Sequence, residues 1–337
     1  MTITEGRGRS VTLRDVAQVA GVSVATASKA INDRPGVSDE TRRRVQEVAE
    51  RLAFTPNSLA RAIVAGQTGT VGLLTHDLEG RFSLPILMGA EDAFGAGRTS
   101  VLLCDARDDA IREQHHLRTL LERRVDGLIV VGSRTDPRTS LGRHVPVPVV
   151  YAYAPSDDPQ DASVVVDNVT AGRIAVEHLL SLGRRSVAHV TGDPGYAAAQ
   201  DRAAGIASTL ADAGLEPAGP ALFGSWTEAW GRAAAAAVLD ASPQVDAIVC
   251  GSDQIARGVL DALRERGVGV PSSVAVVSFD NWKAVVTGAR PELTSVDMNF
   301  QEMGRRAAQR LFERLDGRSE GGVETIAPRL VVRGSSS

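Results

Sequence analysis

The sequence predicts a small all-helical domain at the N-terminus, followed by a larger α/β core. Three helical patterns with capping residues occupy residues 1–56. Beyond Gly69, short runs of β-branched apolar residues alternate with helical patterns, which is typical of parallel sheets covered by helices on both faces. With 337 residues, the chain is long for one compact core and sufficient for two or three.

The first two predicted helices are joined by a turn at Gly21. Thr12 can cap the first helix, with Asp15 in the reciprocal role three residues later. Gly21 tolerates the positive φ of a sharp turn, and Ser23 can cap a second helix that runs to Ile31. The small side chains of this second helix let its backbone approach base edges in the major groove. We interpret the pair as a DNA-reading helix-turn-helix; the alternative is a helical cap that touches no DNA.

A third helical pattern begins at Ser38 and ends before Pro56, because proline disfavours helix at the preceding residue. Its apolar stripe can close a three-helix core over the first two helices. Asn57 can cap a short segment to Ala65, and the glycines that follow mark a boundary. The expected domains are a headpiece at 1–56, a hinge helix and linker at 57–69, and a core at 70–337.

Charge is distributed unevenly along the chain. Residues 1–66 hold ten basic and seven acidic residues, a net charge of +3. The whole chain carries −4, which leaves −7 for the remainder. A positive head on an acidic body favours contact with phosphates at one end only.

Two cysteines, Cys104 and Cys250, each end an apolar run that resembles a buried strand. Such thiols usually fill a core, and their spacing suggests neither a metal site nor a disulfide framework. The N-terminal segment lacks the apolar stretch of a signal peptide, and no run reaches membrane-spanning length. We therefore expect a cytoplasmic protein with no membrane partner, no cofactor and no bound metal.

The core pattern predicts parallel sheets with right-handed crossovers. The expected strands cover residues 70–76, 100–105, 126–132, 147–153, 163–166, 186–192, 245–251 and 273–280. The expected helices cover residues 84–96, 110–123, 168–182, 197–213, 227–240, 252–266 and 300–316, before a final strand and a polar end. Ligands of such sheets bind beyond the carboxyl ends of the strands.

Polar and aromatic side chains follow several of these strands. Carboxylates grip paired hydroxyls and an aromatic face stacks on a sugar ring, so the pattern predicts a site for a polyhydroxylated ligand. The alternative is that the polar residues are ordinary helix caps. The candidates are His76, Tyr151, Tyr153, Tyr196, Trp226, Ser252, Asp253 and Asp280.

Arg202 is the strongest single candidate for ligand contact. It lies one turn into the helix that follows the 186–192 strand, where a guanidinium can reach back over a cleft. Its donors suit vicinal hydroxyls, a carboxylate or a phosphate. The alternative is an arginine on a solvated helix face beside Asp201.

No catalytic motif is present: the sequence lacks a nucleophile elbow, a phosphate-binding loop and a zinc signature. We therefore expect a protein that is not an enzyme. A solute-binding or sugar-processing protein of the same α/β fold is the alternative, but it would need export signals or catalytic residues.

The segments VTLRDVAQVAGVSVATASKAIN and AFTPNSLARAI resemble the headpiece and hinge of the LacI/GalR family of bacterial transcriptional repressors. This resemblance extends over essentially the whole chain. It implies a core of two Rossmann-like subdomains, similar to periplasmic binding proteins of type I, with an N-subdomain at 70–166 plus 296–333 and a C-subdomain at 167–295. It also implies a homodimer on pseudo-palindromic operator DNA and a sugar-like effector in the core cleft.

The resemblance also assigns roles to residues. Phe82 falls in a loop that presents aromatic residues, whereas Met298 stands where glutamine is frequent. Ile63 stands at the lever position, where an apolar side chain can unstack a base step. Effector positions match at Arg202, Trp226, Ser252, Asp253 and Asp280. The DNA-contacting set is Thr12, Leu13, Ser23, Val24, Ala25, Thr26, Ser28, Lys29, Asn32, Asn57, Leu59, Ala60 and Ile63.

Overall fold

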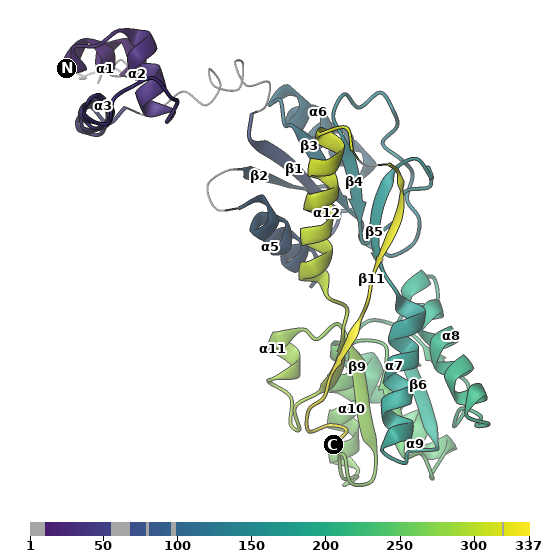
Figure 1. Cartoon of the computed structure of the whole chain (residues 1–337). Helices are drawn as coiled ribbons and strands as arrows, with labels where there is room; N and C mark the ends of the chain where they lie inside the picture. Colours follow the sequence, from purple (N-terminus) through teal and green to yellow (C-terminus); the bar gives the residue numbers. More distant parts are fainter. Residues whose placement is uncertain (1–10, 55–67, 79–80, 96–98, 319) are drawn as a thin grey trace, which may run out of the picture. The chain divides into compact units, whose positions relative to one another are not determined.

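The computed structural model describes residues 11–54, 68–78, 81–95, 99–318 and 320–337. The chain divides into two compact units, residues 1–68 and residues 69–337 (Figure 1). Within the described ranges, no helix is both long and apolar enough to cross a membrane.

The described residues of the first unit form three helices: α1 (Leu13–Ala20), α2 (Val24–Ile31) and α3 (Asp39–Arg51). The caps predicted at Thr12, Ser23 and Ser38 are present. Thr12 Oγ1 accepts a hydrogen bond from the Asp15 amide at 3.3 Å, while the Thr12 amide donates to Asp15 Oδ2 at 2.8 Å. Gly21 has a φ of 66°, which matches the left-handed turn expected there. Local capping and turn chemistry thus set the limits of α1 and the start of α2.

The second unit contains two six-stranded sheets. The first sheet has the order β11-β5-β4-β3-β1-β2, with parallel neighbours throughout. Its α5 (Ser83–Phe94) and α12 (Phe300–Leu315) pack on one face, and α6 (Ala110–Glu122) packs on the other. We call this half the N-subdomain. Its strands are β1 (Thr70–Thr75), β2 (Ser100–Asp105), β3 (Gly127–Val131), β4 (Val149–Ala152), β5 (Ala162–Val166) and β11 (Gly322–Ile326).

The second sheet, with its helices, forms the C-subdomain and has the order β12-β10-β9-β8-β6-β7. One face is covered by α7 (Asn168–Ser181) and α8 (Ala197–Asp212), the other by α9 (Glu228–Ala241) and α10 (Asp253–Glu265). A short α11 (Lys283–Val286) follows β9. The strands are β6 (Val187–Thr191), β7 (Leu222–Phe223), β8 (Ala247–Cys250), β9 (Ala275–Phe279), β10 (Thr294–Asp297) and β12 (Arg329–Val331).

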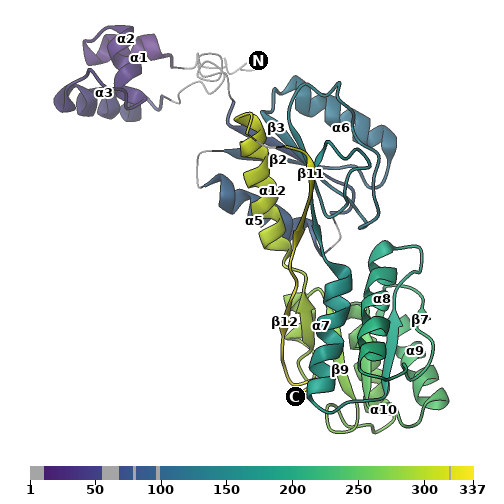
Figure 2. The same ribbon diagram turned by 45° about the vertical axis from the view of Figure 1, so that its right-hand side comes forward.

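The expected subdomain boundary near the C-terminus is corrected by the structure. The final strand is two strands: β11 pairs in the N-subdomain, whereas β12 pairs antiparallel with β10 in the C-subdomain (Figure 2). Pro328 separates them, and a proline has no N–H to continue a ladder. The polar end also packs inward, because the Thr294 amide donates to Ser335 Oγ at 2.8 Å and Ser335 is fully buried.

Glycines allow the helix pairs to cross closely. A Cβ added at Gly89 would lie 1.8 Å from the Gln301 carbonyl oxygen, and one at Gly304 would lie 1.9 Å from the Ile86 carbonyl oxygen. The same reciprocal arrangement occurs between α7 and α8, at Gly172 and Gly205, and between α9 and α10, at Gly231 and Gly258. Backbone carbonyls therefore occupy the space of the missing side chains at all three crossings.

Candidate functional site

In the first unit, α2 presents a small-residue surface. Ala27 and Ala30 are buried against the other helices, so the opposite side of α2 faces away from the core. Val24, at the start of α2, is 44% exposed. The exposed members of the predicted DNA-contacting set on and beside α2 are Ser23, Val24, Ala25 and Lys29.

Other members of that set have structural roles in the headpiece. Leu13 packs against its core, Thr12 caps α1, and Asn32 ends α2 by donating from Nδ2 to the Ser28 carbonyl at 2.9 Å. The Ser23 hydroxyl accepts from the Thr26 amide at 3.1 Å. The hinge residues Asn57, Leu59, Ala60 and Ile63 lie outside the described residues.

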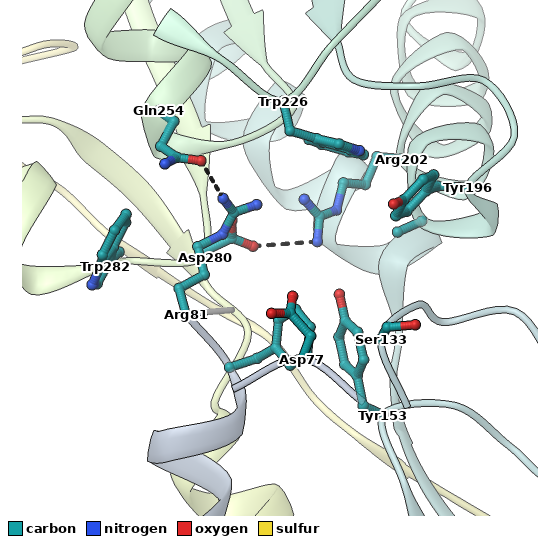
Figure 3. Close-up of a pocket in the computed structure, with 12 residues that line it drawn as sticks. Asp77, Arg81, Ser133, Tyr153, Tyr196, Arg202, Trp226, Gln254, Asp280 and Trp282 are labelled. Carbon is teal, nitrogen blue, oxygen red and sulfur yellow. Dashed lines mark hydrogen bonds and ion pairs between the residues drawn. The ribbon is translucent and has the colours of Figure 1, made fainter. Parts of the chain in front are cut away.

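In the second unit, a cavity of about 320 Å³ lies between the two subdomains. The sequence-predicted residues that line it are Phe82, Tyr153, Tyr196, Arg202, Trp226 and Asp280 (Figure 3). They come from both subdomains, from segments that follow β1, β4, β6, β7 and β9. The carboxyl ends of parallel strands thus converge on one hollow, as the strand pattern predicts.

Arg202 is held deep in the cavity wall. Its Nε donates to Asn168 Oδ1 at 2.9 Å and its Nη1 to the Gly251 carbonyl at 2.6 Å. Its Nη2 lies 3.5 Å from Asp280 Oδ1. The residue is only 2% exposed, so the alternative of a solvated helix face is wrong.

Asp280 stands between two arginines. Its Oδ2 lies 2.8 Å from Nε of Arg81, while its Oδ1 faces Arg202. The backbone at Asp280 has a φ of 96°, a conformation that side chains other than glycine rarely adopt. The surrounding structure therefore holds this carboxylate in place against local backbone preference.

Sequence reasoning missed Arg81. It lies six residues beyond the end of β1, so the rule that singled out residues directly after strands passed it over. Its Nη1 donates to Gln254 Oε1 at 2.7 Å. Burial acts to lower the pKa of Arg81, but the combined attraction of Asp280, Tyr153 and Asp253 outweighs it and raises that pKa above its usual value. The sequence signal that could have identified Arg81 was its position next to Phe82, in a loop already predicted to reach the effector.

Aromatic rings form two walls of the cavity. Trp226 lies over Gly192, where an added Cβ would be 2.2 Å from the indole ring. Its Nε1 is buried and has no hydrogen-bond partner within the described residues. Opposite, Phe82 and Tyr153 stack with ring centroids 4.2 Å apart, and burial raises the pKa of Tyr153 to about 12. The cavity offers rings, a neutral phenol, guanidinium groups and a carboxylate.

Ser252 and Asp253 do not line the cavity. Asp253 is fully buried: its Oδ1 accepts from Ser278 Oγ at 2.5 Å and from Ser295 Oγ at 2.7 Å, and its Oδ2 accepts from the Trp282 amide at 2.6 Å. Ser252 caps α10. Burial, followed by repulsion from Asp280, raises the pKa of Asp253. The prediction of direct effector contact is corrected for both residues: Asp253 holds the segment that carries Asp280, whereas Ser252 is buried at the start of α10.

Tyr151 and His76 also lie elsewhere. Tyr151 packs on the α6 face of the first sheet, where its hydroxyl accepts from the Leu141 amide at 2.7 Å. Tyr153 lies on the opposite face because its φ of 72° reverses the alternation of a strand. His76 lines a neighbouring hollow of about 270 Å³, with its Nε2 2.5 Å from Glu113 Oε2. The predicted effector contacts of Tyr151 and His76 are therefore corrected.

Acid is expected to destabilise the core through His189, a buried residue of β6. Burial, followed by the charge of Arg202, lowers its pKa from 6.5 to about 3. Within the described residues, neither ring nitrogen has a hydrogen-bond partner. Between pH 6.5 and about pH 3, His189 is therefore protonated in the unfolded chain but stays neutral in the folded chain. The free energy of unfolding therefore falls as the pH drops below about 6.5, by a few kcal/mol by about pH 3.

Replacing His189 with leucine is expected to remove this part of the acid sensitivity. Thermal unfolding over a pH series measures it, with His115→Leu as the control because His115 is exposed. Equal acid sensitivity in the wild type and His189→Leu would refute the assignment.

Comparison with known proteins finds matches for both units of the chain. Residues 12–57 match the family model "Bacterial regulatory proteins, lacI family", and residues 176–336 match "Periplasmic binding protein-like domain". Catabolite control protein A of Priestia megaterium is 32% identical over 307 residues, which is 90% of this chain and 92% of that protein. The chain belongs to the lacI family of bacterial regulatory proteins.

Solved structures agree with this family assignment. The Lac repressor dimer bound to operator and the anti-inducer ONPF matches with a TM-score of 0.80 and 26% identity, over 97% of this chain and 99% of the other. The transcriptional regulator CelR in complex with cellobiose matches with a TM-score of 0.66 and 30% identity, over 97% and 100%. This lacI family member is a transcription regulator with a helix-turn-helix headpiece and a periplasmic-binding-protein-like core of two subdomains, which confirms the predicted fold class.

Proposed function

We propose that this lacI family member is a repressor that binds a pseudo-palindromic operator as a homodimer and is controlled by a sugar-like effector. The observation that carries the proposal is the pairing of an exposed small-residue helix in one unit with the buried Arg202–Asp280 pair in the other. The exposed helix α2 suits the major groove of DNA, and the Arg202–Asp280 pair suits a ligand with hydroxyl groups. Action on DNA requires a cytoplasmic location, and no catalytic step is part of the proposal.

The chemistry of the cavity supports a sugar-like effector. The Trp226 ring offers a face on which the apolar side of a sugar can stack, and its Nε1 offers a donor. Asp280 offers acceptors and Arg202 offers donors for hydroxyl groups. The CelR complex with cellobiose, a structural relative of this chain, holds a sugar. Phe82, Tyr153 and Tyr196 complete the proposed effector site.

Control of operator binding follows from the two-subdomain architecture. An effector between the subdomains stabilises one angle between them, and two linked headpieces respond to the change in spacing. Coupling of this kind amounts to about 1–3 kcal/mol between effector and operator. In this proposal, the hinge residues Asn57, Leu59, Ala60 and Ile63 join the headpiece set in contacting DNA.

Replacing Val24 with glutamine is expected to change the preferred operator sequence. An exposed valine at the start of α2 suits the methyl group of thymine, whereas glutamine suits adenine. The exchange should alter the preference at one base pair of each half-site by about 1–3 kcal/mol. Selection of binding sites from random duplexes, followed by mobility shift on the selected operators, measures the change.

The control is Val323→Gln, the same exchange at an exposed position of β11 in the core. It should leave operator preference unchanged. Removal of residues 1–66 should abolish operator binding. Unchanged DNA affinity after that deletion would refute the proposed repressor and favour a solute-binding protein of the same fold.

A further inference from the structure

Arg81 extends from the N-subdomain to the C-subdomain inside the cavity. Its Nε lies 2.8 Å from Asp280 Oδ2, and its Nη1 donates to Gln254 Oε1 at 2.7 Å. Its side chain is 19% exposed and that of Asp280 only 5%. Figure 3 shows the Arg81 guanidinium beside Asp280, facing the same hollow as Arg202 and Trp226. Arg81 thus pairs with the Asp280 carboxylate, which the proposed effector would need as a hydrogen-bond acceptor.

The two arginines depend on Asp280 to different degrees. Arg202 also donates to Asn168 and to the Gly251 carbonyl, both at hydrogen-bond distance. The short ion pair of Arg81 is made with Asp280. Asp253 lies nearby, but its oxygens already accept from two serine hydroxyls and the Trp282 amide. Loss of Asp280 therefore leaves Arg81 short of a compensating negative charge.

This difference discriminates between effector chemistries. A neutral sugar whose hydroxyls take Oδ2 of Asp280 separates that carboxylate from Arg81 and leaves a largely buried cation unpaired, which is strongly unfavourable. A ligand that carries an acidic group as well as hydroxyls avoids this penalty. Its hydroxyls replace Arg81 on Asp280, while its carboxylate or phosphate takes the guanidinium, whose planar fork matches both anions.

We propose that Arg81 is a specificity-determining residue that selects an effector bearing a carboxylate or phosphate together with hydroxyl groups, that is, a sugar acid or a sugar phosphate. This inference rests on the proposed effector site and names the class of its ligand. It requires no change in the roles of Trp226, Arg202 or Asp280.

The test compares matched neutral and acidic sugars on the full-length protein. The probes are the hexoses of gluco, galacto and manno configuration, the corresponding uronates, and the corresponding hexose 6-phosphates. Binding is measured by calorimetry and by tryptophan fluorescence, since Trp226 and Trp282 both line the cavity. The variants are Arg81→Met, which removes the charge, and Arg81→Lys, which keeps the charge and loses the fork. Arg173→Met is the control, an exposed arginine of α7 paired with Glu177.

In the wild type, at least one acidic sugar is expected to bind about tenfold or more tightly than its neutral counterpart, as hydrogen bonds to a charged partner imply. Arg81→Met should bring this ratio close to one, Arg81→Lys should retain part of it, and Arg173→Met should leave it unchanged. The uronate and phosphate arms show which anion the site takes.

Equal or tighter binding of the neutral hexoses to the wild type would overturn the inference, as would an acidic preference that survives in Arg81→Met. Absence of binding by every acidic probe would overturn it too. None of these results depends on operator binding, which is measured separately by mobility shift. Failure of the inference is therefore distinguishable from failure of the proposed repressor.

Discussion

Replacing Asp280 with alanine is expected to abolish effector binding and to lower the free energy of unfolding by about 3–5 kcal/mol. The carboxylate lies between Arg81 and Arg202, at 2.8 and 3.5 Å, and its side chain is only 5% exposed. Its removal leaves two neighbouring guanidinium groups in the cavity wall without the charge between them. Urea denaturation measures the stability, and titration with the best-binding sugar measures effector affinity.

The matched control is Asp240→Ala. Asp240 also pairs with an arginine, Arg266, but its side chain is 68% exposed, so solvent screens the pair and the loss of stability should be much smaller than at Asp280. A second comparison separates charge from packing. If unpaired charge causes the instability, adding Arg81→Met to the Asp280→Ala variant should restore part of the lost stability. Equal stability of the wild type and Asp280→Ala would contradict the assignment of this ion-pair cluster.

Replacing Gly205 with valine is expected to destabilise the C-subdomain by about 3 kcal/mol or more, since overpacking at a closely packed site forces the backbone to move. A Cβ at Gly205 would lie 2.1 Å from the Val169 carbonyl oxygen. The neighbouring helix α7 also lies close to the backbone of Arg202, because a Cβ added at Gly172 would be 2.4 Å from the Arg202 carbonyl oxygen. A shift of α7 away from Gly205 would therefore disturb the effector site.

The exchange at Gly205 should therefore weaken effector binding as well as stability. Helix α8 carries Arg202 and begins beside Tyr196, so a shift of the helix moves both side chains. Thermal unfolding and effector titration measure the two effects. Gly219→Ala is the control, because the nearest atom to an added Cβ there is 4.0 Å away. A Gly205→Val variant with wild-type stability would show that the α7–α8 crossing tolerates separation.

The local features of this chain were predictable because they depend on residues close in sequence. The capping box at Thr12, the left-handed turn at Gly21 and the cap at Ser23 all involve partners within a few positions. The alternation of apolar strands and helices likewise predicted parallel sheets with right-handed connections. Six of the ten predicted effector residues line the cavity. The family resemblance assigned Phe82, and the other five lie in segments that follow parallel strands, whose carboxyl ends are fixed by the topology of the sheet.

The tertiary structure decided what depends on distant partners and on single backbone angles. A φ of 72° at Tyr153 places it in the cavity wall and leaves Tyr151 behind the sheet, a difference that alternation alone does not predict. Asp253 became a structural acceptor because Ser278 and Ser295 lie beside it only after the second sheet forms. Arg81 reaches Asp280 across 199 positions of sequence.

The sequence by itself determined the domain order, the helix-turn-helix and the strand ends where a ligand binds, since capping, turn formation and hydrophobic periodicity are local properties of the chain. Only the tertiary structure decided which charged side chains line the cavity and which, such as Asp253, hold the surrounding segments in place. Those choices depend on burial and on the pairing of charges between residues that the fold alone brings together.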